Sequence, residues 1–311
     1  MTVPDRRGIF FHLMAAVLLS TLTAAGTAAQ DLEPKAYSAS PTDAVFIVAG
    51  ASRLTGGLVF DPTVPIKDVE GRFGAGVLAG GYTFGLFGKL ALVTAAVPFA
   101  SGEFSGLVNE NAQTITRTGF TDARFKVSVN LVGNPAMRAR AFVKAPRKTI
   151  VGASLTMTAP SGEYDDTKLV NLGTNRWAFK PEVGVAVPAG HWDFDGYVGV
   201  WLFTRNDNFY PGGLMRTQDP VVALQAHASY TFRPRLWVAI DSTWYAGGSA
   251  LVEGGEPGTG MNNSRLGATV SLPVGRSQAF KVSYSSGVSV RTGTNFRSLS
   301  VGWQWLWLTR T

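Results

Sequence analysis

The sequence of 311 residues contains no cysteine. Disulfide scaffolds and cysteine-ligated zinc or iron–sulfur sites are therefore excluded, as is a lipoprotein anchor acylated on cysteine. Histidine is also scarce, since there are only three and His12 lies near the start. Few groups are left for metal binding or acid–base chemistry, so the sequence predicts no metal and no cofactor.

Charged residues are scarce as well, at 16% of the chain, whereas soluble domains have about 25%. After the first 30 residues no apolar run reaches the ~20 residues that a membrane-spanning helix needs. The longest charge-free stretch, residues 73–88, contains six glycines, which disfavour a helix. We therefore expect a chain without a second membrane-spanning helix and rich in β-strands.

The first 29 residues have the order of a secretory signal peptide. Arg6 and Arg7 precede an apolar run at residues 9–22, and small residues follow at 24–29. We expect cleavage near Ala28 or Ala29, which leaves one barrel domain over residues 30–311. An exported chain rarely meets nucleic acid, so the net charge of +7 does not indicate nucleic-acid binding.

Alternation of apolar and polar residues is the main structural signal. In residues 298–307, Leu299, Val301 and Trp303 share one face with two further tryptophans, and serine, glycine and glutamine occupy the other. Short and long connections alternate along the chain, which is typical of an outer-membrane barrel. We predict an all-β, transmembrane, antiparallel up-and-down barrel of about 12 strands, near residues 43–53, 72–84, 88–98, 120–131, 149–159, 176–187, 192–204, 220–232, 235–246, 263–273, 279–291 and 295–307.

Long loops are expected at 54–71, 99–119, 160–175, 205–219 and 247–262, and short turns between the other strand pairs. The connection at 132–148 is an exception, because it is long and lies on the short-turn side. Aromatic residues at the ends of the apolar faces favour a membrane barrel over a soluble sandwich.

The polar face is too charged for a dry core and is interpreted as the lining of a pore. Lys180 and Glu182 are expected to pair with Asp193 or Asp195 on the neighbouring strand, and structural ion pairing remains an alternative role for each charge. Rings of basic residues favour anions. The predicted pore-lining residues are Arg124, Lys126, Arg176, Lys180, Glu182, Asp193, Asp195, Trp201, Gln225, His227, Asp241, Arg265 and Lys281.

Residues 149–185, TIVGASLTMTAPSGEYDDTKLVNLGTNRWAFKPEVGV, resemble the family called the MetA-pathway of phenol degradation. The segments FTRNDNFYPGG at 203–213 and RTGTNF at 291–296 agree with it. The resemblance implies an outer-membrane transporter linked to catabolism of aromatic compounds, and a folded plug or mouth element at residues 161–174. It departs at 132–148, where this chain has five basic residues and no acidic one, in place of a mixed-charge helix.

An enzyme is the competing class, because some outer-membrane phospholipases are barrels. A serine nucleophile would need a histidine base, and only His191 and His227 are available, neither placed to face the outer leaflet. We therefore expect no enzyme but a channel for small aromatic or hydrophobic, including anionic, compounds. A general-diffusion pore and a plugged structural barrel remain alternatives.

The expected surroundings follow from this function. The barrel would lie in the outer membrane of a Gram-negative bacterium, as a monomer with both termini periplasmic. Its partners would be the membrane lipid, the small-molecule substrate and the outer-membrane assembly machinery.

Overall fold

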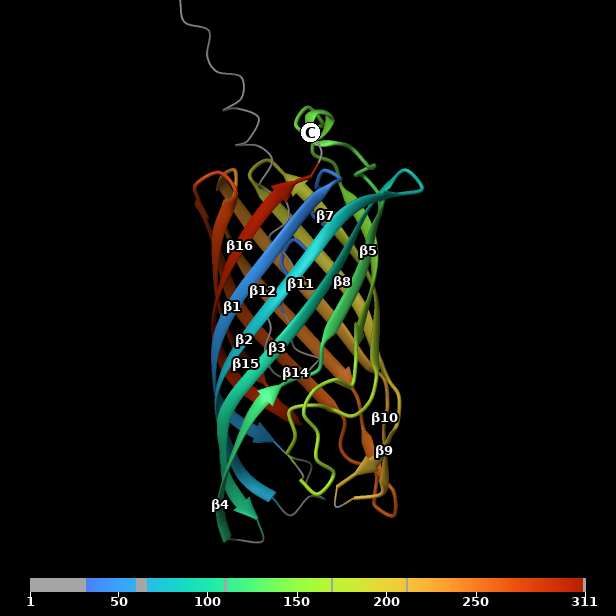
Figure 1. Ribbon diagram of the computed structural model, residues 1–311, viewed down its shortest axis with the longest axis vertical. Helices are drawn as coiled ribbons and strands as arrows, with labels where there is room; N and C mark the ends of the chain where they lie inside the picture. The colour runs from blue at the N-terminus through green and yellow to red at the C-terminus, as the bar shows by residue number, and fades with distance from the viewer. Residues whose placement is uncertain (1–31, 60–65, 109–110, 169, 211, 310–311) are drawn as a thin grey trace, which may run out of the picture.

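The computed structural model describes residues 32–59, 66–108, 111–168, 170–210 and 212–309. The expected signal peptide at residues 1–29 lies outside the described residues. Thirteen strands form one closed antiparallel sheet, and β4 and β5 share one place in it because both pair with β3. The predicted barrel of about 12 strands is thus confirmed (Figure 1).

The strands of the barrel are long, and each pairs mainly with its sequence neighbours. They are β1 (Ala44–Val59), β2 (Ile66–Leu86), β3 (Lys89–Val108), β4 (Asn111–Phe120), β5 (Arg124–Val132), β6 (Ile150–Thr158), β7 (Ala178–Ala189), β8 (Trp192–Phe203), β11 (Val221–Arg233), β12 (Leu236–Gly247), β14 (Met261–Val274), β15 (Gln278–Ser289) and β16 (Gly293–Leu308). A separate small sheet contains β9 (Asn206–Phe209), β10 (Leu214–Gln218) and β13 (Ala250–Val252).

The two ends of the barrel differ. One end, called here the turn end, carries the tight connections after β2, β7, β11 and β14. Strand β1 begins and β16 ends there, and Thr309 N–H donates to Asp43 O at 2.8 Å. The opposite end, called the loop end, carries the small sheet of β9, β10 and β13 (Figure 1).

The connection at 132–148 lies at the turn end and contains the only helix among the described residues, α2 (Ala139–Phe142). Within the part of the chain that is described, no helix is long and apolar enough to cross a membrane. The basic side chains of this connection are exposed, including Arg138, Arg140 and Lys148.

The first three strands extend well beyond the predicted bounds. Residues 54–71 and 99–119 were expected to be loops, but most of them continue β1, β2 and β3 and form β4. These segments pair directly, and hydroxyl pairs such as Ser101–Thr118, 2.7 Å apart, connect β3 to β4. The loop prediction was wrong because glycine and small polar residues hide the alternation of the two faces there.

Strand pairing is interrupted where β4 gives way to β5. Ala91–Ala96 of β3 pair with β5, whereas Phe99–Val108 pair with β4. Pro98 lies at this changeover, and proline has no N–H to donate to a ladder. Its carbonyl oxygen instead accepts from Thr121 N–H at 3.0 Å, in the short segment that joins β4 to β5.

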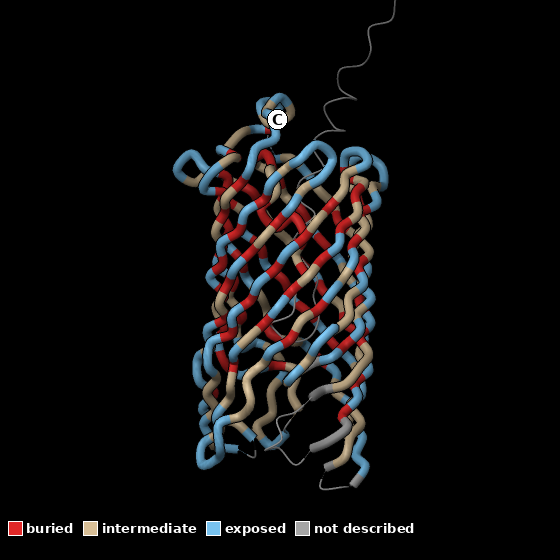
Figure 2. The backbone as a smooth tube through the Cα atoms, turned by 180° about the vertical axis from the view of Figure 1, so that it is seen from behind, coloured by how far each residue is buried: buried red, intermediate tan, exposed pale blue. Residues whose placement is uncertain are grey.

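Buried and exposed residues alternate along the strands (Figure 2). Outward-facing side chains form an apolar belt that contacts membrane lipid, with Ile240 69% and Leu78 62% exposed. Near the loop end the belt contains Trp244, and near the turn end it contains Trp192 and Trp307. This placement matches the preference of amphipathic rings for lipid–water interfaces.

Candidate functional site

The interior of the barrel has two chemically different walls. From Ala44 to Leu54 in β1, Phe73 to Thr83 in β2 and Leu90 to Ala100 in β3, the described inward-facing side chains carry no charge. We call this the apolar wall. Its larger side chains are Phe46, Val48, Leu54, Phe73, Val77 and Leu92.

Strands β5 to β15 form the charged wall. Ten of the predicted pore-lining side chains are buried inside the barrel: Lys126, Arg176, Lys180, Glu182, Asp195, Trp201, Gln225, His227, Asp241 and Arg265. Arg124, Asp193 and Lys281 are half-buried. The charged residues therefore lie on one side of the interior and face the apolar wall across it.

Residues 32–43, called here the lumenal segment, lie inside the barrel. Residues 33–37 contact the charged wall, whereas Pro41 and Asp43 bond Thr83 of β2. Lys126 Nζ lies 2.5 Å from Glu33 Oε2. Gln225 Oε1 accepts from Glu33 N–H at 3.4 Å, and the hydroxyl of Tyr197 accepts from Ala36 N–H at 3.0 Å. Sequence reasoning missed this segment, because its short polar run has neither strand nor helix periodicity.

Tyr37 anchors the lumenal segment. Its side chain is 1% exposed, and its hydroxyl lies 3.0 Å from Ser154 Oγ and 3.2 Å from Glu182 Oε1. Gly152 and Gly184 face each other across β6 and β7, and a Cβ at either would lie 2.2–2.3 Å from the Tyr37 ring. These two inward-facing glycines therefore form the space for the ring, and they are the signal from which the segment could have been inferred.

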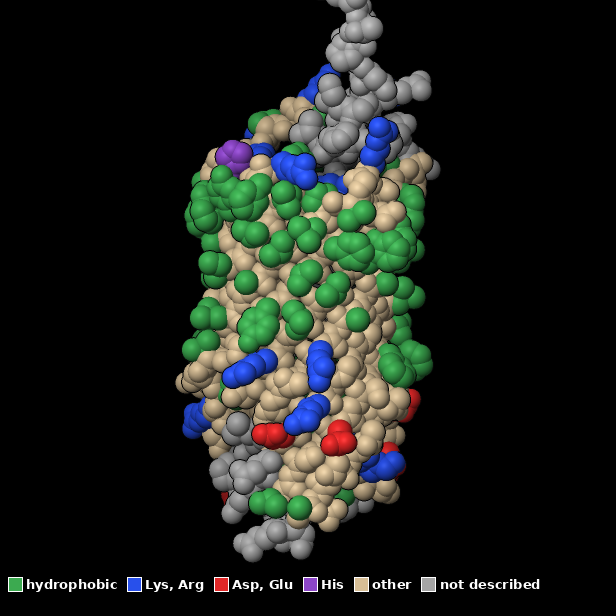
Figure 3. Space-filling view, turned by 90° about the vertical axis from the view of Figure 1, so that its left-hand side faces the viewer, with side chains coloured by type: hydrophobic (Ala, Val, Ile, Leu, Met, Phe, Trp, Pro, Cys, Tyr) green, Lys and Arg blue, Asp and Glu red, His purple; other side chains and the backbone are tan. Residues whose placement is uncertain are grey.

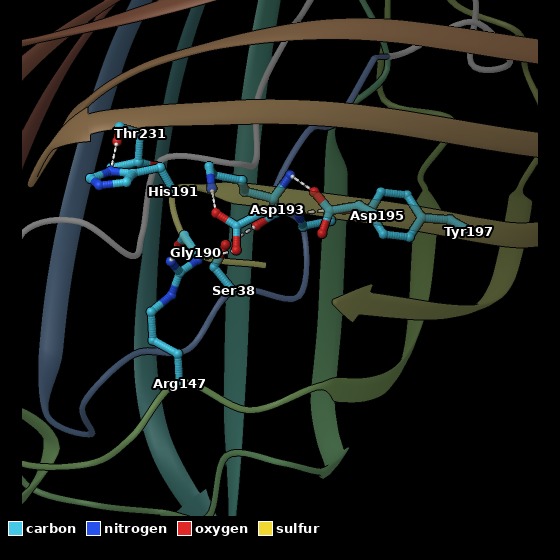
Figure 4. Close-up of polar contacts among 10 residues, drawn as sticks. Ser38, Arg147, Gly190, His191, Asp193, Asp195, Tyr197 and Thr231 are labelled. Carbon is cyan, nitrogen blue, oxygen red and sulfur yellow. Dashed lines mark hydrogen bonds and ion pairs between the residues drawn. The ribbon is translucent and has the colours of Figure 1, made fainter. Parts of the chain in front are cut away.

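Asp193 joins the lumenal segment to the connection at the turn end. Its carboxylate lies 2.5 Å from Lys35 Nζ and also forms an ion pair with Arg147. Figure 4 shows Arg147 approaching Asp193 from the connection that precedes β6. Asp195 Oδ2 accepts from Lys35 N–H at 3.2 Å, so both carboxylates of β8 hold Lys35.

The expected pairing of Lys180 or Glu182 with Asp193 or Asp195 was wrong. Lys180 Nζ lies 2.8 Å from Glu182 Oε2 on the same strand. The antiparallel register places Asp195 opposite Ala186 and Asp193 opposite Pro188. Both carboxylates are thus displaced along the barrel toward the turn end, where Lys35 meets them.

His227 and Asp241 form a second buried polar group, farther along the charged wall. His227 Nδ1 lies 2.7 Å from Asp241 Oδ1, and the hydroxyl of Thr269 donates to Asp241 Oδ2 at 2.8 Å. His227 Nε2 has no hydrogen-bond partner in the described chain. No serine or threonine hydroxyl is therefore positioned on that nitrogen as a nucleophile would be.

Several basic side chains lie against aromatic rings, among them Arg176 and Lys281. The guanidinium carbon of Arg176 is 4.4 Å from the centre of the Phe203 ring, and Arg176 also bonds Gln218. Lys281 Nζ is 6.0 Å from the Trp237 ring and is buried without a hydrogen-bond partner among the described residues. Lys281 is thus a cation beside a flat apolar surface.

Residues 160–168 and 170–175 fold into the loop-end mouth of the barrel. Asp122 Oδ1 accepts from Gly162 N–H at 2.9 Å, and Asp122 Oδ2 accepts from Thr174 N–H at 2.9 Å. Leu172 packs on the inward-facing cluster that includes Leu54. The loop therefore covers part of the mouth, as the resemblance implied.

Asp165, in the same loop, is half-buried. Hydrogen bonds from Lys168 and Thr167 lower the pKa of its carboxyl to about 2. Its carboxylate is thus occupied within the loop by these two neighbours.

The barrel is similar in structure to outer-membrane proteins. The COG4313 outer membrane channel from Pseudomonas putida F1 superimposes with a TM-score of 0.75 and 18% identity, covering 89% of this chain and 100% of that one. The transport unit of the autotransporter AIDA-I from Escherichia coli gives a TM-score of 0.52 and 9% identity, with 100% of both chains covered. At these identities the likeness concerns the fold.

No curated protein matches the sequence. A family model does, over residues 57–305, under the description "Putative MetA-pathway of phenol degradation". This range includes the segments at 149–185, 203–213 and 291–296 that carry the resemblance. Because the match spans most of the chain, the protein belongs to this family.

Proposed function

We propose that this protein is an outer-membrane channel for the passive movement of small aromatic or hydrophobic compounds. The apolar wall is the observation that carries the proposal. Hydrogen bonds of residues 33–37 to the barrel go to β5, β6, β7, β8 and β11, on the charged wall. A solute passing between the lumenal segment and the apolar wall would contact uncharged side chains of β1, β2 and β3. Desolvated apolar surface favours hydrophobic solutes there by roughly 25 cal/mol per Å² buried.

An anionic group on the solute would meet basic side chains that form no ion pair within the described residues, and Lys281 is one of them. Lys126 and Lys180 are neutralised by Glu33 and Glu182, so they add little attraction for anions. Lys281 has no hydrogen-bonding partner in the described residues and adjoins the Trp237 ring. The pair suits a carboxylate attached to an aromatic ring, in which the ring stacks and the carboxylate meets the ammonium group.

The alternatives receive less support. An esterase or phospholipase would need a hydroxyl nucleophile bonded to its histidine base, and His227 Nε2 has no such partner among the described residues. A general-diffusion pore would need no apolar wall along three adjacent strands. A plugged structural barrel would pass neither polar nor apolar solutes, so flux measurements separate these cases.

We propose that the turn end faces the periplasm and the loop end faces the outside, with the chain acting as a monomer. Because the chain has no cysteine, a single introduced cysteine is its only thiol. Labelling of that thiol from outside the cell shows which end of the barrel faces the outside. On intact cells a membrane-impermeant maleimide should label Glu256→Cys, in the exposed loop after β13, and not Arg276→Cys, in the turn after β14. The opposite labelling would refute this orientation.

The function is tested by flux into liposomes that contain the purified protein. Benzoate should enter faster than a sugar of similar size. Lys281→Gln should slow benzoate several-fold and leave a neutral aromatic such as benzyl alcohol unchanged. Equal entry of benzoate and the sugar would indicate a general pore, and entry of neither would indicate a plugged barrel.

The apolar wall is tested by isosteric changes. Val48→Thr combined with Val77→Thr places hydroxyls on the wall without changing side-chain volume and should slow benzyl alcohol. Thr243→Val is the matched control, because it changes a buried hydroxyl of the charged wall that has no hydrogen-bond partner in the described chain. If the control slows entry as much as the double variant, the path does not follow the apolar wall.

A further inference from the structure

Three arginines lie together on the outside of the barrel, at the loop-end margin of the apolar belt. Arg297 of β16 is opposite Thr55 of β1, which is opposite Arg72 of β2. Arg53 lies two residues from Thr55 on the same strand. Directly opposed residues share a face of a sheet, so the three side chains point outward together. We call Arg53, Arg72 and Arg297 the arginine patch.

The spacing of the patch suits one ligand group. Neighbouring strands lie about 4.8 Å apart and residues rise about 3.4 Å along a strand. The Cα atoms of Arg297 and Arg72 are thus about 10 Å apart, and Arg53 lies about 7 Å along β1 from the row that joins them. Arginine side chains can converge over these distances on a phosphate between them.

The patch lies at the height of a lipid headgroup. Arg53 is in the same row as Leu299, which is 51% exposed on the apolar belt. On β16, Arg297 is ten residues from Trp307, which corresponds to about 24 Å of membrane height for a strand tilted by about 45°. An outer-membrane barrel has an apolar band about 25 Å tall, so the patch begins where the hydrocarbon ends.

The arginines are available to a ligand. All three are exposed, and no ion pair to any of them is found among the described residues. Two carboxylates adjoin Arg72: Glu103 is opposite it on β3, on the side away from Arg297, and Glu70 lies two residues before it on β2. Figure 3 shows basic side chains gathered just beyond the green belt, with acidic ones farther out.

This arrangement is local to one side of the barrel. At the loop-end margin, outward-facing basic residues of the described barrel strands occur on β16, β1 and β2. Elsewhere the same margin carries Trp244, Leu202 or Thr118, which bear no charge. A general attraction of the protein to the anionic membrane surface would not require the basic residues to be concentrated on three adjacent strands.

We propose that the arginine patch binds the phosphate groups of an outer-leaflet glycolipid, a phosphorylated acyl disaccharide of the lipid A type. The acyl chains would lie on the belt beside Leu299 and Leu78, and the phosphates would accept hydrogen bonds from the guanidinium groups. The assignment rests on the proposed orientation, in which the loop end faces the outer leaflet.

Binding of lipid A to the purified barrel in zwitterionic micelles, followed by native mass spectrometry, tests the site. Replacing all three arginines, in Arg53→Gln/Arg72→Gln/Arg297→Gln, should weaken binding of bisphosphorylated lipid A at least tenfold. The matched control Arg138→Gln/Arg140→Gln/Arg276→Gln removes three exposed charges at the turn end and should leave binding unchanged. Glu103→Gln, which removes the adjacent carboxylate, should strengthen binding.

The source of the phosphate is distinguished by three further probes. Enzymatically dephosphorylated lipid A should bind the wild type as weakly as bisphosphorylated lipid A binds the triple variant. Millimolar inorganic phosphate should fail to displace lipid A, and phosphatidylglycerol should bind at least tenfold more weakly. Displacement by phosphate, equal binding of phosphatidylglycerol, or unchanged binding by the triple variant would overturn the proposal.

Failure of this site and failure of the proposed channel are separate results. Benzoate flux through the triple variant in phospholipid liposomes should equal that of the wild type. If the triple variant loses lipid A binding but keeps normal benzoate flux, the lipid site is supported. If the wild type binds lipid A but passes no benzoate, only the proposed channel function is overturned.

Discussion

Removal of the Tyr37 side chain should release the lumenal segment without unfolding the barrel. The barrel strands pair with one another independently of this residue, whereas residues 32–38 are held by it together with the ion pairs of Glu33 and Lys35. The variant Tyr37→Ala is therefore expected to remain a closed barrel with a wider interior. Its ionic conductance in planar bilayers should rise several-fold, and a sugar should enter liposomes faster.

The magnitude follows from the contacts of Tyr37. Burial of the ring contributes about 2 kcal/mol, and the hydrogen bonds of its hydroxyl contribute about 1 kcal/mol each. The edge-to-face contact with Tyr197, at 5.3 Å between ring centres, adds somewhat less than 1 kcal/mol. With two such hydrogen bonds the total is about 5 kcal/mol, which changes the ratio of seated to released segment by roughly a few thousandfold.

Two companion variants make the test decisive. Gly184→Ala keeps Tyr37 but places a methyl group where the ring lies, so it should raise conductance in the same way. Tyr284→Ala is the matched control, because this tyrosine is 48% exposed on the outer face. Unchanged conductance in both Tyr37→Ala and Gly184→Ala, with folding verified by heat-modifiable gel migration, would refute the role of the segment.

Three other perturbations have defined outcomes. Asp122→Ala removes the acceptor that holds residues 160–175, so trypsin should cut at Lys168 faster; an unchanged rate would show that other contacts hold the loop. Asp241→Ala leaves His227 without its partner and should lower barrel stability by about 3 kcal/mol, as for other broken buried pairs; an unchanged unfolding midpoint would contradict this. The pKa of Asp165 is depressed to about 2. The ionised carboxylate therefore contributes fully to loop stability above about pH 4, and this contribution is lost as the pH falls through 2. An NMR titration of the Asp165 carboxyl with a midpoint near 4 would contradict the bonding from Lys168.

The fold could be predicted because most strands alternate clearly between lipid and interior. Trp303 and Val301 of β16, for example, face lipid, whereas Gln304 is buried inside. The bounds failed where the signal weakens, in the glycine-rich residues around Gly57 and Gly71. There the glycines interrupt the alternation of apolar and polar side chains, so only the pairing partners reveal that the strands continue.

The candidate site was less predictable, because its key contacts join distant segments. The alternation places Lys126 and Asp193 inside the barrel but does not reveal Glu33 and Lys35, which neutralise them. Side-chain register within a strand is a local property, whereas the position of an irregular segment depends on the completed interior. Gly184, a residue without a side chain at an inward position, was the local sign that something else fills the space.

The position of the lumenal segment constrains the order of assembly. Glu33 bonds Lys126 and Gln225, which follow it by 93 and 192 residues in the chain. Yet the segment continues directly into Ala44, the first residue of β1, and β1 closes the barrel against β16. The segment is synthesised before the barrel strands but can be seated only when the strands that hold it exist. Because contacts of such long range form slowly, we expect closure of the barrel and seating of this segment to be coupled late steps of biogenesis.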